Sequence, residues 1–183
     1  MWTENSDFDC FEVYLDTLIH RPASIDGIAL PTVRNIQEAE FICTNFEAVI
    51  TAGPLERECD WAHPNHRVWS FQDTESDHGP HLQQVEEMLA FGVDHDDVLV
   101  HCHAGISRST ATAWGIAMAK GADPEVAFRA LMDAHPEESF AGPRPFSPNR
   151  RLVAHLQQIL GYSDLLNIRD RVLREGSNPP WWL

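Results

Sequence analysis

The sequence is poor in basic residues and has no long hydrophobic run. Its 183 residues include 13 Lys and Arg against 28 Asp and Glu, a formal net charge of −15. A surface this acidic repels nucleic acid and anionic lipid, so we expect neither as a partner. No apolar stretch approaches the roughly 18 residues that a membrane span needs, and the acidic N-terminus is unlike a secretory signal. We therefore expect a cytoplasmic protein that captures any anionic ligand locally.

Cysteine is also scarce, and its spacing fits neither a disulfide scaffold nor a zinc site. His101 and His103 could in principle ligate a metal, but no carboxylate or second Cys is spaced to complete the site. We thus expect no metal and no cofactor. Whether one of the other cysteines can form a disulfide with Cys102 stays open; these are Cys10, Cys43 and Cys59.

Helical and strand-like segments alternate along the chain. Hydrophobic periodicity and β-branched content predict strands at 11–18, 46–51, 67–71 and 98–100, and helices at 36–45, 81–93, 109–120, 124–135 and 149–160. Prolines mark loops at 55–66 and 136–148, and the tail 161–183, which ends in NPPWWL, is expected to be irregular. The alternation predicts an α/β fold: one domain over 1–183 with a central, mainly parallel sheet flanked by helices.

The segment HCHAGISRS, from His101 to Ser109, lies between the apolar run VLV and an alanine-rich helix. A loop that joins a buried strand to a helix N-terminus directs its backbone N–H groups to one point, which is an anion site. Gly105 permits the necessary turn, and Arg108 offers a fork of donors for two phosphate oxygens. The same positive environment favours the thiolate of Cys102, a nucleophile beside a bound phosphate.

The segment HCHAGISRS resembles the signature H-C-x5-R-[ST] of the cysteine-based protein phosphatases, and VLVHCxAGISRS is similar to their dual-specificity branch. The segments VYL, FEAVITAGP, FQDTES and RPFSPNRRLVAHLQQ resemble other parts of the same branch. The resemblance covers about 11–160 and leaves 161–183 as a C-terminal extension. It implies a dual-specificity phosphatase-like α/β fold.

The resemblance also implies residue roles. Cys102 would attack phosphorus and form a phosphocysteine, and Ser109 would hydrogen-bond the sulfur and ease its departure. His101 would orient the loop from behind. Asp73, in FQDTES, would be the general acid, with Asp77 as the alternative and Asp60 a more distant one. The phosphate would be held without metal by the loop residues His103, Ala104, Gly105, Ile106, Ser107 and Arg108.

The substrate class stays open at this point. The leading hypothesis is a phosphatase of phosphotyrosine, phosphoserine or phosphothreonine in proteins. The alternatives are a phosphoinositide, nucleotide or RNA 5′-phosphate as substrate, a silent phosphate-binding module, and a rhodanese-like sulfur transferase. The resemblance implies that lipid-directed relatives tend to carry Lys in this loop, and its absence here argues against a lipid substrate; the pair Arg108 and Ser109 favours phosphate over sulfur.

One dense basic group stands out in this acidic chain, formed by Arg144, Arg150 and Arg151. It is interpreted either as a rim that attracts an acidic phosphosubstrate or as incidental charge at the start of a helix. The sequence gives no indication of the oligomeric state.

Overall fold

The computed structural model describes residues 19, 21–22, 24–54, 63–135, 138–139, 142–143 and 145–176. Several predictions fall outside these residues: the strand at 11–18, the positions of Asp60, Cys10, Cys59 and Arg144, and the NPPWWL segment.

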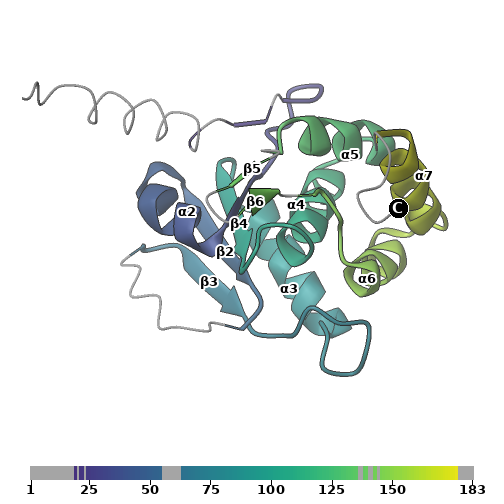
Figure 1. The fold of residues 1–183 in the computed structure, drawn as a ribbon, viewed down its shortest axis with the longest axis horizontal. Coiled ribbons are helices and arrows are strands. Elements are labelled where there is room, and N and C mark those ends of the chain that lie inside the picture. Colours follow the sequence, from purple (N-terminus) through teal and green to yellow (C-terminus); the bar gives the residue numbers. More distant parts are fainter. Residues whose placement is uncertain are drawn as a thin grey trace, which may run out of the picture.

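A four-stranded, wholly parallel sheet forms the centre of the described structure (Figure 1). Its strand order is β1-β4-β2-β3, with β1 at Thr32–Asn35, β2 at Ala48–Ala52, β3 at His66–Trp69 and β4 at Val98–Cys102. The predicted fold class is therefore confirmed. Because β4 lies between β1 and β2, the segment that follows it leaves the sheet near its middle.

Helices cover both faces of the sheet (Figure 1). On one face lie α2 (Ile36–Ile42) and the short 3-10 helix η1 (Cys43–Asn45). The other face carries the larger core, to which five helices contribute: α3 (Leu82–Val93), α4 (Arg108–Ala119), α5 (Pro124–Asp133), α6 (Arg150–Leu160) and α7 (Leu165–Gly176).

Successive side chains along each strand point to opposite faces of the sheet, and apolar side chains occupy both faces. Val49 and Leu99 belong to the cluster under α2, whereas Ile50 and Val100 belong to the cluster under α4. A parallel sheet covered on both sides needs strands without polar outward positions, and VLV is such a strand. Trp114 of α4 is the largest fully buried side chain among the described residues, and it belongs to the larger core.

The structure differs from the sequence analysis at three places. Strand β1 was not predicted, because it is only four residues long and contains Arg34 and Asn35. The predicted loop 136–148 contains a two-residue antiparallel pair, β5 (Glu138–Ser139) with β6 (Gly142–Pro143). The prediction of an irregular tail was wrong for residues 165–176, which form α7, while 177–183 lie outside the described residues.

Packing and ion pairs explain α7. Leu165 and Val172 are fully buried in the main core, and their spacing of seven residues places them on one helix face. Arg171 Nη2 lies 2.6 Å from Glu125 Oε2 of α5, and this ion pair links the exposed side of α7 to α5. Residues 165–176 are therefore part of the domain and not a loose extension.

Candidate active site

Cys102 is the last residue of β4, in the middle of the sheet and buried. Its Sγ lies 3.2 Å from the Oγ of Ser109, in the first turn of α4. The strand end and the helix start are joined by residues 103–107. We call residues 101–109 the phosphate loop. The sequence-predicted nucleophile and the serine that would assist it thus lie within hydrogen-bonding distance.

Gly105 allows the phosphate loop to pass close to β1. It has a φ of +73°, which favours glycine. A Cβ at this position would lie 2.8 Å from the backbone N of Asn35, so the contact also excludes a side chain.

The phosphate loop is anchored through its carbonyl groups. The carbonyl of His103 accepts from Ile36 N at 3.3 Å, at the start of α2. Those of Ile106 and Ser107 accept from the backbone N–H groups of Ser147 and Asn149, each at 3.1 Å. The segment before α6 therefore fixes the second half of the loop.

Arg108 is 93% shielded from solvent and its guanidinium is held at one place. Its Nη1 donates to the carbonyl of Phe71 at 3.3 Å, and its Nε lies 3.6 Å from Asp73 Oδ2. The guanidinium packs against Gly53, where a Cβ would lie 2.7 Å from Arg108 Cζ. A side chain held so closely before any ligand arrives is suited to bind an anion without reorganisation.

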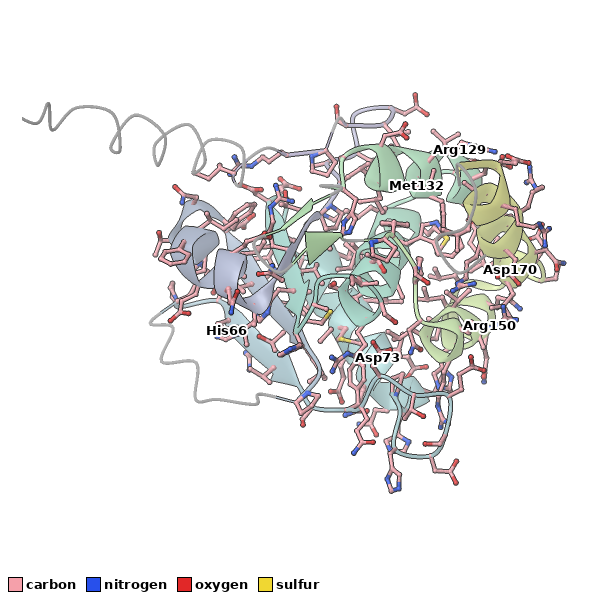
Figure 2. The ribbon with its side chains drawn as sticks, in the orientation of Figure 1. His66, Asp73, Arg129, Met132, Arg150 and Asp170 are labelled. Carbon is pink, nitrogen blue, oxygen red and sulfur yellow. The ribbon has the colours of Figure 1, made fainter. Side chains whose placement is uncertain are left out.

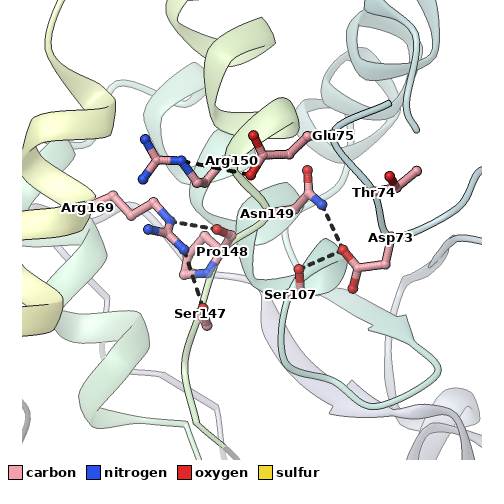
Figure 3. A pocket seen from close by; sticks show the side chains of 9 residues that line it. All are labelled: Asp73, Thr74, Glu75, Ser107, Ser147, Pro148, Asn149, Arg150 and Arg169. Carbon is pink, nitrogen blue, oxygen red and sulfur yellow. Dashed lines mark hydrogen bonds and ion pairs between the residues drawn. The ribbon is translucent and has the colours of Figure 1, made fainter. Parts of the chain in front are cut away.

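Asp73 is the carboxylate that the fold brings to the phosphate loop. Its Oδ1 accepts from Ser107 Oγ at 2.8 Å and from Asn149 Nδ2 at 2.7 Å (Figure 3). Asp77, the alternative acid, has a fully exposed carboxylate, and the structure places it 3.8 Å from Arg151 Nη1. The geometry thus favours Asp73 over Asp77 as the group that can reach a bound ester.

Asn149 is a site residue that the sequence analysis did not assign. It begins α6, where its Oδ1 accepts from the backbone N of Leu152 at 2.9 Å, and this leaves its Nδ2 to donate to Asp73. The segment SPN, which precedes the predicted helix 149–160, indicates a helix start, but it does not identify Asp73 as the partner of Asn149.

His101 lies behind the loop in a chain of hydrogen bonds. Thr51 Oγ1 is 2.7 Å from His101 Nε2 and 2.7 Å from His66 Nε2. Burial, with a smaller effect of His66, lowers the pKa of His101 to about 3, so its imidazole is neutral at physiological pH. Since the one hydroxyl proton of Thr51 serves a single partner, at least one imidazole donates to it. His101 is thereby oriented by β2 and β3.

A cavity of about 320 Å³ lies beside the phosphate loop (Figure 3). Asp73 and Ser107 line its loop side, and Arg150 and Arg169 line the side of α6 and α7. Figure 2 shows Arg150 near Asp170, to which its Nη1 donates at 2.7 Å. Acidic and basic side chains therefore both line this cavity, and one of the acidic ones is Asp73, the carboxylate that would act as the acid.

The basic group was left open between a rim for an acidic substrate and incidental charge, and the structure gives its described members Arg150 and Arg151 different surroundings. Arg150 is partly exposed and borders the cavity. Arg151 instead donates to backbone carbonyls of the loop before α3, which points to a structural role for it.

Cys43, the other described free thiol, lies in the cluster under α2, whereas Cys102 lies at the end of β4. Burial raises the pKa of the Cys43 thiol. Over the described ranges, no three His, Cys, Asp or Glu side chains are grouped so that they could hold a metal ion. Helices long and apolar enough to cross a bilayer are likewise absent from the described residues.

No protein-family model matches the sequence, and no curated protein matches it. Solved structures of phosphatases do match the fold. The Yvh1 phosphatase domain from Chaetomium thermophilum is 19% identical, with a TM-score of 0.53 over 77% of this chain and 95% of that one. The Cydia pomonella PTP-2 phosphatase is 20% identical, with a TM-score of 0.52 over 75% and 89% of the two chains.

A mouse putative dual-specificity phosphatase, solved with zinc tungstate, is 18% identical, with a TM-score of 0.50 over 80% of this chain and 96% of that one. The chain therefore has the fold of the dual-specificity and tyrosine phosphatases. Within that fold, Cys102 and Arg108 are at the strand end and helix start that enclose the phosphate loop.

Proposed function

We propose that the protein is a cysteine-dependent phosphatase that hydrolyses phosphomonoesters through a phosphocysteine. One observation carries the proposal. A buried thiol at the end of a central strand lies 3.2 Å from a serine hydroxyl, beside an arginine that is already held at the helix start. A core cysteine with no chemical role would need neither the buried guanidinium of Arg108 nor the close turn at Gly105.

In the first step the Cys102 thiolate attacks phosphorus, and the bond from phosphorus to the leaving oxygen breaks. Arg108 and the N–H groups of the phosphate loop hold the equatorial oxygens, where charge gathers. Asp73, held by Ser107 and Asn149, donates its proton to the leaving oxygen. This step leaves a phosphocysteine, a free alcohol or phenol, and an ionised Asp73.

In the second step water attacks the phosphocysteine, and the Asp73 carboxylate accepts a proton from that water. The sulfur–phosphorus bond breaks, which regenerates the thiolate and releases inorganic phosphate. Ser109 Oγ, 3.2 Å from the sulfur, donates a hydrogen bond that stabilises the departing thiolate. Every step uses groups of this chain, so the mechanism needs no metal.

For the substrate, we propose a phosphoprotein with either phosphotyrosine or phosphoserine and phosphothreonine as the target. The support is the similarity of the fold to a protein named as a dual-specificity phosphatase, together with a phosphate loop without Lys. Parallel assays on phosphopeptides, phosphoinositides and nucleotides distinguish this class from the non-protein ones.

The test of the chemistry is turnover of an aryl phosphate in excess chelator by the wild type, Cys102→Ser and Cys43→Ala. We expect activity in the wild type and in Cys43→Ala, and none in Cys102→Ser, because a serine hydroxyl does not ionise near neutral pH. Tungstate, present in the mouse structure, should still bind Cys102→Ser, since the anion site remains. Wild-type levels of turnover by Cys102→Ser would refute the nucleophile assignment.

A further inference from the structure

Arg151, in the first turn of α6, donates hydrogen bonds to backbone carbonyls of a loop more than seventy residues earlier in the chain. Its Nε donates to Pro80 O at 3.0 Å, and its Nη1 donates to Glu75 O at 2.9 Å and to Ser76 O. We call residues 72–80 the acid loop, because Asp73 is its second residue. One side chain thus holds three carbonyl groups of the loop that carries the proposed general acid.

Other contacts show that the acid loop is shaped around this arginine. His155, one turn further along the same face of α6, bonds the carbonyl of Pro80 at 3.0 Å. A Cβ at Gly79 would lie 2.3 Å from Thr74 O and 3.0 Å from Arg151 Cδ, so the backbone of the loop and Arg151 together leave no room for a side chain there. The loop also closes on itself, since Gln72 N donates to His78 O at 2.9 Å.

The start of α6 therefore holds the acid loop in two ways. Asn149 donates to the carboxylate of Asp73, and Arg151 holds the backbone that follows it. A nine-residue surface loop samples many conformations unless its polar groups are bound. The bonds from Arg151 remove that freedom before any substrate arrives.

We propose that Arg151 is a positioning residue that places Asp73 for proton transfer by fixing the backbone of the acid loop. This proposal rests on the proposed function, because it requires Asp73 to be the general acid. Arg151 need not touch the substrate: it acts through Glu75, Ser76 and Pro80 on the loop, and through the loop on Asp73. Its effect on the first step, which kcat/KM reports, is therefore confined to substrates whose leaving group needs a proton; the second step is the same for every substrate.

Leaving-group dependence separates this role from a general contribution to folding. The leaving group of an aryl phosphate with a strongly acidic phenol departs as the phenolate without protonation. The alkoxide of an alkyl phosphate must instead receive a proton from the acid. Arg151→Met should lower kcat/KM on the alkyl phosphate by about 10-fold or more, since a displacement of about 1 Å in a reacting group can cost up to about 100-fold. On the activated aryl phosphate we expect a change in kcat/KM of less than about 3-fold.

Two comparison variants sharpen the experiment. Arg171→Met removes the same charge from an arginine of α7 that pairs with Glu125, and we expect wild-type kinetics on both substrates. Arg151→Lys keeps the charge but has one donor group in place of the fork, so it should recover only part of the lost kcat/KM. Thermal unfolding of each variant confirms that it is folded during the assay.

A double variant tests whether Arg151 acts through Asp73. If it does, adding Arg151→Met to Asp73→Asn should lower kcat/KM on the alkyl phosphate no further, because the acid is already absent. Equal losses of kcat/KM on both substrates, or full additivity in the double variant, would overturn the positioning role while leaving the proposed function intact. An Asp73→Asn enzyme with wild-type kcat/KM on the alkyl phosphate would overturn the acid assignment and this proposal with it. An inactive wild type would refute the proposed function itself.

Discussion

Gly53 leaves the space in which the Arg108 guanidinium lies, and Gly53→Ala should therefore impair phosphate binding. The added Cβ would lie 2.7 Å from Arg108 Cζ and 3.3 Å from its Nε, and closer still to Nη1. Atoms cannot remain at these separations, so the guanidinium must move away from its bond to Phe71 O. The residue's φ of +133° adds strain for any L side chain, on the order of 1–3 kcal/mol.

The loss of activity follows from the displaced donors. A hydrogen bond to a charged group contributes about 1.5–3 kcal/mol, and each 1.4 kcal/mol is about a factor of ten. If Arg108 loses one bond to the phosphate, kcat/KM should fall by about 10- to 100-fold. The competitive inhibition constant for vanadate or tungstate should rise by a similar factor, because these oxyanions occupy the same site.

Gly161→Ala is the matched control for backbone strain. Gly161 also has a positive φ, +74°, but a Cβ there would meet nothing within 4 Å. We expect it to lower the melting temperature and to leave kcat/KM and oxyanion inhibition unchanged. Wild-type kcat/KM in Gly53→Ala, or an equal loss in Gly161→Ala, would refute the idea that Gly53 serves Arg108.

Further measurements test the rest of the site. Activity should survive exhaustive chelation; loss that is restored by a divalent metal would contradict a metal-free mechanism. Asp73→Asn should lower kcat on poor leaving groups by about 100-fold or more and remove the basic-side fall of the pH profile, while Asp77→Asn should not; the reverse result would transfer the acid role to Asp77. Because the pKa of His101 is about 3 when folded and about 6.5 when unfolded, the unfolded chain binds more protons between these values. The free energy of unfolding should thus fall as the pH is lowered from about 6.5, by at most about 1.4 kcal/mol per pH unit from this group. Urea denaturation at several pH values should show a smaller dependence in His101→Gln; an unchanged slope would contradict the burial of a neutral His101.

The sequence alone predicted the parallel α/β fold and the phosphate loop. Both follow from local patterns: the apolar strand VLV at 98–100, followed by a glycine-containing turn and a helix, has few alternative structures. Helix caps are equally local: Asp123, directly before Pro124, accepts from the backbone N–H groups of Glu125 and Val126.

Other features depended on tertiary structure. The helix α7 went unrecognised because much of its stability comes from burial of Leu165 and Val172 and from ion pairs with α5, which are contacts distant in the sequence. The sequence also left Asp73 and Asp77 as alternative acids, since both lie in one short polar segment. Only the folded chain places Asp73 against Ser107 and Asn149 and turns Asp77 to solvent.

The proposed nucleophile and its arginine could therefore be predicted from the sequence, because they lie in one contiguous segment of nine residues. The groups around them were decided by the tertiary structure: Gly53, Thr51, Asn149 and Arg151 come from β2, its end and α6. Local patterns report which conformations a segment can adopt, whereas these contacts join residues up to 76 positions apart. Such contacts exist only after the sheet and the helices have packed together.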